Sequence, residues 1–241
     1  MPNSVLSVSN LCVSFGSRTV IHGLSFKLEQ GDCLAVIGPN GSGKSVLLKA
    51  LLHLLPSPSE IRGEIHWSES ARLGYVPQRV APDRQLPLRV KDLLEAKVRF
   101  LQLSATDVER VASETGLTGE LLDTRLGILS GGQFQKVLIA FALLGDPNVL
   151  MFDEPTASLD ELTEERIYES LHSLQKDRGL TVILVSHDLS VVYRYADMVL
   201  CLSKVRLCMG PPREILTPQL LEELYSAPAK YYKHVQQHLD H

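Results

Sequence analysis

The sequence predicts an α/β fold built around a parallel sheet, because apolar runs of strand length alternate with segments of helical periodicity. Two of these runs, 149–152 and 181–185, consist almost entirely of apolar residues, which is typical of strands buried on both faces of a parallel sheet. A third run, 33–37, leads into a glycine-rich loop and then into an amphipathic segment. Strand, loop and helix in this order form the repeating connection of open α/β sheets.

The amino-terminal segment has a different pattern. Residues 4–29 alternate apolar and polar side chains, with breaks at Gly16 and Gly23, which predicts a small antiparallel β subdomain. The other elements expected before residue 79 are a helix over 46–55, a turn at 56–59, and strands at 63–67 and 72–76.

A helical subdomain is predicted next, between about 88 and 122, where apolar residues recur every three or four positions. After it we expect a helix at 133–144, a strand at 149–152, a helix near 161–176, a strand at 181–185 and a helix near 189–195. We therefore expect one domain over 1–241. Its expected parts are an α/β core at about 1–85 and 146–215, an inserted helical subdomain at about 86–145, and a helical tail at about 216–241.

Bulk composition limits the possible functions. The chain has 241 residues, 44% of them hydrophobic, and a formal net charge of −4, which argues against a general nucleic-acid-binding surface because such surfaces need clustered Lys and Arg. The longest apolar run, 137–144, is less than half of the roughly 20 residues that a membrane helix needs. The first residues lack the pattern of a signal peptide. We expect a cytoplasmic protein without nucleic-acid partners.

The four cysteines, Cys12, Cys33, Cys201 and Cys208, form no C-x-x-C pair. We expect reduced and mostly buried thiols. A metal site that uses Cys201 and Cys208 is the alternative interpretation. The histidines of the carboxyl-terminal tail, His234, His238 and His241, are expected to belong to a frayed polar end, and metal sensing is the alternative for them.

The glycine-rich loop fits the pattern G-x-x-x-x-G-K-[ST] between a strand and a helix. Its residues are Gly38, Pro39, Asn40, Gly41, Ser42, Gly43, Lys44 and Ser45, and Val46 follows. Glycines let successive N–H groups point into one concavity, and the helix amino terminus adds partial positive charge. We expect Lys44 to contact the β- and γ-phosphates of ATP and Ser45 to ligate Mg²⁺. A glycine-rich turn without a ligand is the alternative.

Two carboxylates directly follow the apolar run 149–152, namely Asp153 and Glu154. Ligands of open α/β sheets bind at the carboxyl ends of strands. Neighbouring side chains on a strand point to opposite sides, so we expect Asp153 to hold Mg²⁺ and Glu154 to act on water. Gln78 and His187 also follow strands and are expected at the same edge of the sheet, where the Gln78 amide can contact Mg²⁺ or the attacking water. Solvent-exposed acids at a strand end are the alternative for the pair.

Six motifs in one order carry a resemblance to the ATP-binding subunits of ABC transporters, over most of the chain. Residues 38–45 resemble the Walker A loop, 74–78 the Q-loop, 129–133 (Leu-Ser-Gly-Gly-Gln) the signature, 149–155 Walker B, 158–160 the D-loop and 186–188 the switch region.

The resemblance implies a head-to-tail dimer, in which Ser130, Gly131, Gly132 and Gln133 of one subunit complete the ATP site of the other. A Ser-Gly-Gly turn that opens a helix is also a physical anion site, with free N–H groups and a favourable helix dipole.

The resemblance also assigns individual roles. It implies that Glu154 polarises the attacking water, that His187 contacts the γ-phosphate and that Asp160 bridges subunits. Phe15 matches the aromatic residue that stacks on adenine, and a buried core phenylalanine is the competing interpretation.

The segments 72–78 and 86–90 resemble the zinc and manganese uptake branch of the family. This implies ATP-driven import of zinc, or next of manganese, through a separate integral membrane permease, with a periplasmic or surface substrate-binding protein as an indirect partner. The chain would then lie peripherally on the cytoplasmic face of the cell (inner) membrane. An importer ATPase for another substrate, or a soluble ABC ATPase acting in assembly or regulation, remains the alternative.

Overall fold

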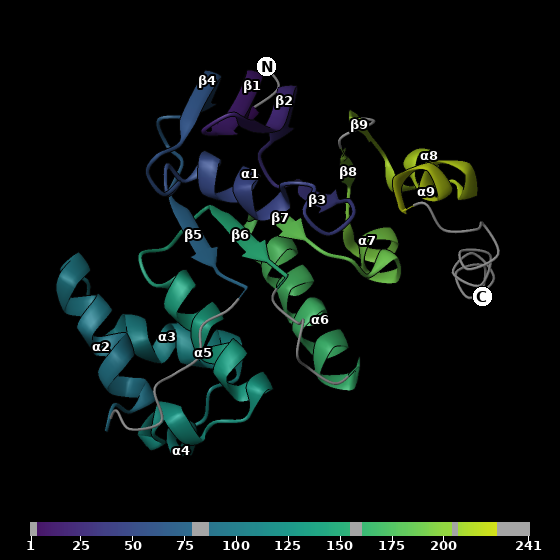
Figure 1. Cartoon of the computed structure of the whole chain (residues 1–241). Coiled ribbons are helices and arrows are strands. Elements are labelled where there is room, and N and C mark those ends of the chain that lie inside the picture. Colours follow the sequence, from purple (N-terminus) through teal and green to yellow (C-terminus); the bar gives the residue numbers. More distant parts are fainter. Residues whose placement is uncertain (1–3, 79–86, 155–160, 204–206, 226–241) are drawn as a thin grey trace. The chain divides into compact units, whose positions relative to one another are not determined.

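The computed structural model describes residues 4–78, 87–154, 161–203 and 207–225. They form two compact units, one made of the described residues within 1–70 and 181–241 and the other of those within 71–180. Strands and helices alternate in both (Figure 1), so the predicted α/β class is confirmed.

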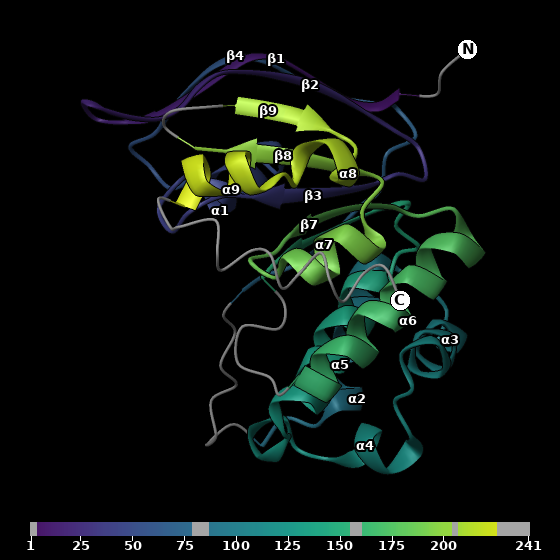
Figure 2. The same ribbon diagram turned by 90° about the vertical axis from the view of Figure 1, so that its right-hand side faces the viewer.

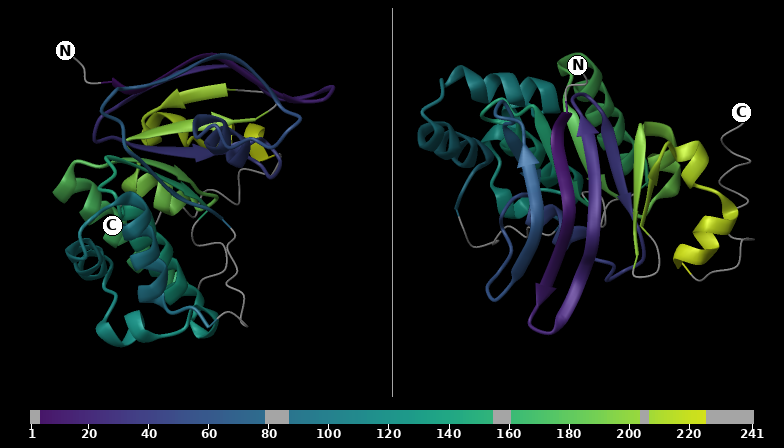
Figure 3. Two further views of the ribbon diagram at one scale, coloured as in Figure 1. Left: turned by 90° about the vertical axis from the view of Figure 1, so that its left-hand side faces the viewer. Right: turned by 90° about the horizontal axis from the view of Figure 1, so that it is seen from above.

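An antiparallel sheet of three strands opens the first unit, β1 (Ser4–Phe15), β2 (Arg18–Glu29) and β4 (Glu60–Trp67), in the order β2-β1-β4. Figure 3 shows the three strands side by side. The predicted antiparallel pairing within residues 4–29 is confirmed, and β4 adds to it on the other side of β1. Trp67 Nε1 donates a hydrogen bond to the Leu51 carbonyl oxygen over 3.0 Å, which ties this sheet to the helix after the glycine-rich loop.

Four further strands of this unit lie in the order β7-β3-β8-β9. The first three are parallel and β9 is antiparallel (Figure 2). Their bounds are β3 Cys33–Ile37, β7 Thr181–Val185, β8 Met198–Leu202 and β9 Leu207–Gly210. Every residue of β3 and β7 is buried, as the continuous apolar runs predicted.

The helices of the first unit are α1 (Lys44–Leu51), α7 (Leu189–Tyr195), α8 (Pro212–Ile215) and α9 (Pro218–Tyr225). The prediction for α7 is confirmed, whereas α1 begins two residues earlier than predicted, directly after the glycine loop. A buried apolar cluster joins β3 and β8 to α7 and α9, and it includes Ala35, Val192, Val199 and Leu221. This cluster holds β3, the strand that leads into the loop, from one side.

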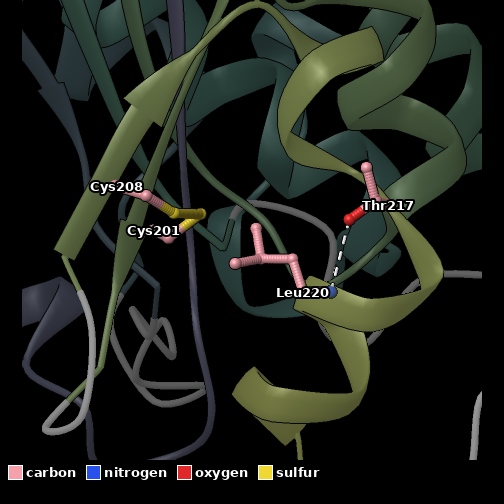
Figure 4. Close-up of a disulfide and its surroundings, with 4 residues drawn as sticks. All are labelled: Cys201, Cys208, Thr217 and Leu220. Atoms are coloured by element: carbon pink, nitrogen blue, oxygen red, sulfur yellow. Dashed lines mark hydrogen bonds between the residues drawn. A yellow bond between two sulfur atoms is a disulfide. The ribbon is translucent and has the colours of Figure 1, made fainter.

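A disulfide links Cys201 of β8 to Cys208 of β9 (Figure 4). The prediction of reduced thiols is therefore wrong for this pair, and the two sulfurs bond to each other rather than to a metal. The reason lies in the antiparallel pairing, which places Cys201 directly opposite Cys208, a register that the spacing alone did not reveal. Cys12 and Cys33 are thiols outside any disulfide of the described residues. Near the disulfide, Thr217 Oγ1 accepts a hydrogen bond from the Leu220 amide over 3.3 Å.

The second unit contains one parallel strand pair, β5 (Leu73–Val76) with β6 (Val149–Asp153). Its helices are α2 (Val90–Leu101), α3 (Thr106–Thr115), α4 (Gly119–Asp123), the 3₁₀ turn Leu126–Ile128, α5 (Gly131–Leu143) and α6 (Glu161–Arg178). The helical periodicity predicted between about 88 and 122 is confirmed. The helix predicted from residue 133 begins instead at Gly131, because Ser130 caps it and the glycines form its first turn.

Close packing fixes β5 against its neighbours at Gly74. A Cβ atom there would lie 2.6 Å from Leu150 Cδ1 and 2.9 Å from the Ala142 carbonyl oxygen. Only glycine lets β5 approach both β6 and α5 at this distance. This close approach fixes the position of the residues that follow β5, including Gln78.

We expect Cys208→Ser to lower the free energy of unfolding by about 2 kcal/mol, because the disulfide closes a short loop that the unfolded chain would otherwise sample freely. Urea unfolding of the oxidised protein measures the loss. Cys12→Ser is the matched control, since Cys12 is a free thiol. Equal stabilities of Cys208→Ser and the wild type would contradict the prediction.

Candidate functional site

The glycine-rich loop has a backbone that only glycine adopts easily. Gly38 and Gly43 have φ angles of 150° and 105°. A Cβ atom on Gly38 would lie 2.0 Å from the Leu202 carbonyl oxygen, and one on Gly43 would lie 2.9 Å from Val20 Cγ1. Both glycines are therefore required by conformation and by space, and the loop is held tightly against β2 and β8.

Lys44 lies inside this loop rather than in solvent. Its side chain is buried, and its Nζ donates hydrogen bonds to the carbonyl oxygens of Gly38, over 2.9 Å, and of Pro39, over 3.4 Å. The buried Ser42 hydroxyl has no hydrogen-bond partner among the described residues. A buried cation beside an unsatisfied hydroxyl donor at a helix amino terminus suits a phosphate group, so the loop fits the predicted ligand. Ser45 and Val46, half-buried, occupy the first turn of α1.

His187 is exposed, between β7 and α7 of the same unit. The turn that carries it is well fixed. Asp188 accepts hydrogen bonds from the amides of Ser190, over 2.8 Å, and Val191, over 3.5 Å, as the cap of α7. The Asp188 amide donates to Ser186 Oγ over 3.1 Å. His187 is therefore held on a rigid turn with its imidazole open to solvent.

Phe15 is half-buried at the end of β1, directly before the Gly16 turn. It is not part of the fully buried apolar core, so part of its ring surface remains available for a stacking partner.

The two carboxylates lie in the second unit. Asp153 is the last residue of β6 and is only 2% exposed. Glu154 follows with a φ of 46°, a left-handed conformation that is uncommon outside glycine. Gln78 Nε2 donates a hydrogen bond to Glu154 Oε2. The structure thus brings together two of the predicted catalytic residues, Gln78 and Glu154, although 76 positions separate them in sequence.

Tyr75 is a residue at this site that the sequence reasoning missed. Its hydroxyl donates to Asp153 Oδ2 over 3.4 Å. Burial, and then the negative charge of Asp153 and the hydrogen bond to it, raise the pKa of Tyr75 to about 12, so the hydroxyl keeps its proton near neutral pH. The alternation of side chains along a strand would have placed Tyr75 on the same face as Asp153, but only if β5 and β6 were known to be neighbours.

The Ser-Gly-Gly turn begins α5 as a capping box. Ser130 Oγ accepts from the Gln133 amide over 3.3 Å, and Gln133 Oε1 accepts from the Ser130 amide over 2.9 Å. The predicted free N–H groups are therefore only partly present, because two of them already have acceptors. The amides of Gly131 and Gly132, in the first turn, have no intrahelical acceptor. Gly132 also packs tightly, since a Cβ there would lie 2.5 Å from Thr163 Cγ2.

A cavity of about 530 Å³ lies beside the amino-terminal ends of β5 and β6, away from the carboxylates. Arg72, Arg110, Asp146 and Arg178 are among the residues that line it. Each of its guanidinium groups pairs with a carboxylate. The positive charge of this cavity is therefore already compensated, and the cavity is not part of the predicted site.

Some predicted features fall outside the described residues. Asp160 and the histidines His234, His238 and His241 are among them. Within residues 4–78, 87–154, 161–203 and 207–225, no cluster of three or more His, Cys, Asp or Glu side chains could hold a metal ion. In the same part of the chain, none of the helices combines the length and the apolar character that crossing a bilayer requires.

Comparison with known proteins extends these observations. The sequence profile described as ABC transporter matches residues 21–157. The zinc import ATP-binding protein ZnuC of Cereibacter sphaeroides is 37% identical over 216 residues, which cover 88% of this chain and 84% of that protein. The protein of the same name from Acinetobacter baylyi is 34% identical over 237 residues, which cover 98% of this chain and 88% of that protein.

A solved structure described as an inward-facing metal-chelate type ABC transporter aligns with a TM-score of 0.82 at 29% identity, covering 94% of this chain and 90% of that chain. These matches confirm the α/β fold that the resemblance to ABC ATP-binding subunits implies, a P-loop nucleoside triphosphatase core.

We expect Gln133→Ala to destabilise the protein by about 1 kcal/mol, because it removes one half of the capping box. Gln133→Glu is the matched variant, since its carboxylate can accept the same hydrogen bond near the positive end of the helix dipole. Urea unfolding measures both. A loss of equal size in the two variants would contradict the capping role.

Proposed function

This chain belongs to the ABC transporter family, and from that membership we propose that it is the ATP-hydrolysing subunit that powers import of a divalent metal ion through a separate membrane permease. Its activity is that of the ABC ATPases, in which ATP hydrolysis is coupled to transport. The observation that carries the catalytic part of the proposal is the hydrogen bond between Gln78 and Glu154. Catalysis needs a carboxylate held in one orientation, and Gln78 restrains that of Glu154.

We assign phosphate binding to the glycine-rich loop. Lys44 directs its ammonium group toward the loop carbonyls, and it can exchange these contacts for oxygens of the β- and γ-phosphates. The unsatisfied Ser42 hydroxyl and the amides at the start of α1 supply further donors. Phe15, with part of its ring exposed, would stack on the adenine base.

We assign hydrolysis to Glu154 as the group that polarises water. Its carboxylate accepts a hydrogen bond from Gln78 and follows a strand whose end is buried. A carboxylate in this position can orient a water molecule for in-line attack on the γ-phosphorus and accept its proton. His187, on its capped turn, would contact the γ-phosphate as a hydrogen-bond donor.

Mg²⁺ would be held by oxygens of Ser45, Gln78 and Asp153. These hydroxyl, amide and carboxylate groups are the hard oxygen ligands that this ion prefers. When bound, Mg²⁺ neutralises charge that develops on the β- and γ-phosphates during transfer.

The amino terminus of α5 supports a dimeric arrangement. Ser130 and Gly131 are exposed, and the neighbouring Ile128 exposes 74% of its surface. We propose that a second copy of the chain covers this surface head-to-tail, so that the amides of Gly131 and Gly132 approach the γ-phosphate bound by that copy. Asp160 would bridge the two subunits.

The proposed cargo rests on relatives. Several proteins named zinc import ATP-binding protein align with more than 80% of their own length. We therefore propose zinc as the first cargo and manganese as the second. The partners would be an integral membrane permease and, indirectly, a periplasmic or surface substrate-binding protein, with the chain on the cytoplasmic face of the membrane.

We expect Glu154→Gln to reduce ATP turnover by a factor of at least about 100, because it removes the proton acceptor and keeps the shape. ATP affinity should stay within a few-fold of the wild type, and size-exclusion chromatography with ATP should show a stable dimer. Lys44→Ala is the contrasting variant, since it should weaken ATP binding itself. Unchanged turnover of Glu154→Gln would refute the role of Glu154.

The cargo is tested in cells. In a strain that lacks this protein, we expect cellular zinc to fall under zinc limitation, and the wild-type gene, but not Glu154→Gln, to restore it. Elemental analysis measures zinc and manganese together. Loss of manganese alone would reassign the cargo, and unchanged levels of both metals would contradict metal import.

A further inference from the structure

The pairing of β5 with β6 sorts their side chains onto two faces. Tyr75 lies opposite Met151, and Val76 lies opposite Phe152. Side chains two positions apart on a strand share a face, so Asp153 projects on the same face as Met151. Tyr75 and Asp153 are therefore diagonal neighbours across the pair, a separation that a long aromatic side chain can span.

The contact itself joins the Tyr75 hydroxyl to Asp153 Oδ2 over 3.4 Å. Asp153 is 2% exposed, and a buried carboxylate needs hydrogen-bond donors to offset its lost hydration. Tyr75 is a rigid donor, because its ring is half-buried and its strand is fixed by the close packing at Gly74. The hydroxyl thus approaches Asp153 from a fixed direction.

The neighbouring carboxylate receives a different donor. Glu154 accepts from Gln78, which follows β5. The segment 75–78 consequently supplies one donor to each of two adjacent carboxylates, an aromatic hydroxyl to Asp153 and an amide to Glu154. Two separate donors can hold the two carboxylates in separate orientations.

We propose that Tyr75 is a positioning residue that orients the Asp153 carboxylate for Mg²⁺, an inference that rests on the proposed metal-binding role of Asp153. Tyr75 contacts Oδ2 and limits the rotation of the carboxylate about its side-chain bonds. Outer partners of metal ligands commonly contribute about 10- to 100-fold to metal affinity. The length of this hydrogen bond places Tyr75 at the lower end of that range.

Tyr75→Phe tests the proposal, because it removes the hydroxyl and keeps the ring. Mn²⁺ serves as the probe, and its binding to the full-length protein with saturating ADP is followed by electron paramagnetic resonance. We expect about a tenfold loss of Mn²⁺ affinity, with an equal rise in the Mg²⁺ concentration that gives half-maximal ATPase activity. ADP affinity measured in EDTA should not change. Tyr193→Phe is the control, since Tyr193 packs against the apolar cluster of the other unit.

Asp153→Asn separates this inference from the proposed function. If Asp153→Asn loses Mn²⁺ binding while Tyr75→Phe binds Mn²⁺ like the wild type, the role of Tyr75 is overturned and that of Asp153 stands. If Asp153→Asn keeps wild-type Mn²⁺ affinity, the metal role proposed for Asp153 fails. An equal loss of ADP affinity in EDTA and of Mn²⁺ affinity in Tyr75→Phe would show a purely structural effect and would also overturn the inference.

Discussion

The parallel register between β5 and β6 is the constraint on which the carboxylate arrangement depends. It fixes Tyr75 opposite Met151 and Val76 opposite Phe152. This register brings the hydrogen-bond donors of Tyr75 and Gln78 within reach of Asp153 and Glu154. A slip by one residue would exchange the faces of every side chain in β5. Tight packing at Gly74 against Leu150 and the Ala142 carbonyl prevents such a slip.

The glycine-rich loop of the first unit also depends on close approach of backbone to its neighbours. Gly38 and Gly43 bring its backbone against β8 and β2, at distances that exclude a side chain. The loop is therefore shaped by its surroundings before any ligand arrives, and Lys44 is already buried within it. Pre-organisation of this kind reduces the conformational entropy that a ligand would otherwise have to remove on binding.

Much of the fold was predictable because its signals are local. Apolar runs located β3, β6 and β7 nearly to the residue, and glycine patterns located the loop. The features that were missed depend on contacts between distant segments. Tyr75 and Asp153 are 78 positions apart, and no local sequence pattern indicates that β5 and β6 are neighbours. The disulfide between Cys201 and Cys208 was missed because it depends on the register of a hairpin, and the spacing of seven is compatible with several registers.

The hydrogen bonds among the candidate site residues were harder to predict than the positions of these residues at strand and helix ends. The position of Gln78 after a strand correctly predicted that it lies near the carboxylates. The sequence did not reveal that the Ser130 amide already donates a hydrogen bond to the Gln133 side chain. The reason is that a capping box and an open anion site have the same sequence pattern at the start of a helix.

The long separation between segment 75–78 and the end of β6 has a consequence for the order in which the protein is made. The hydrogen bond between Tyr75 and Asp153 joins residues 78 positions apart, and the helices α2 to α5 lie between them in the sequence. During synthesis, the donors of segment 75–78 leave the ribosome long before the carboxylates that they hold. A nascent chain can therefore align Asp153 and Glu154 with these donors only after the residues of α2 to α5 have been synthesised.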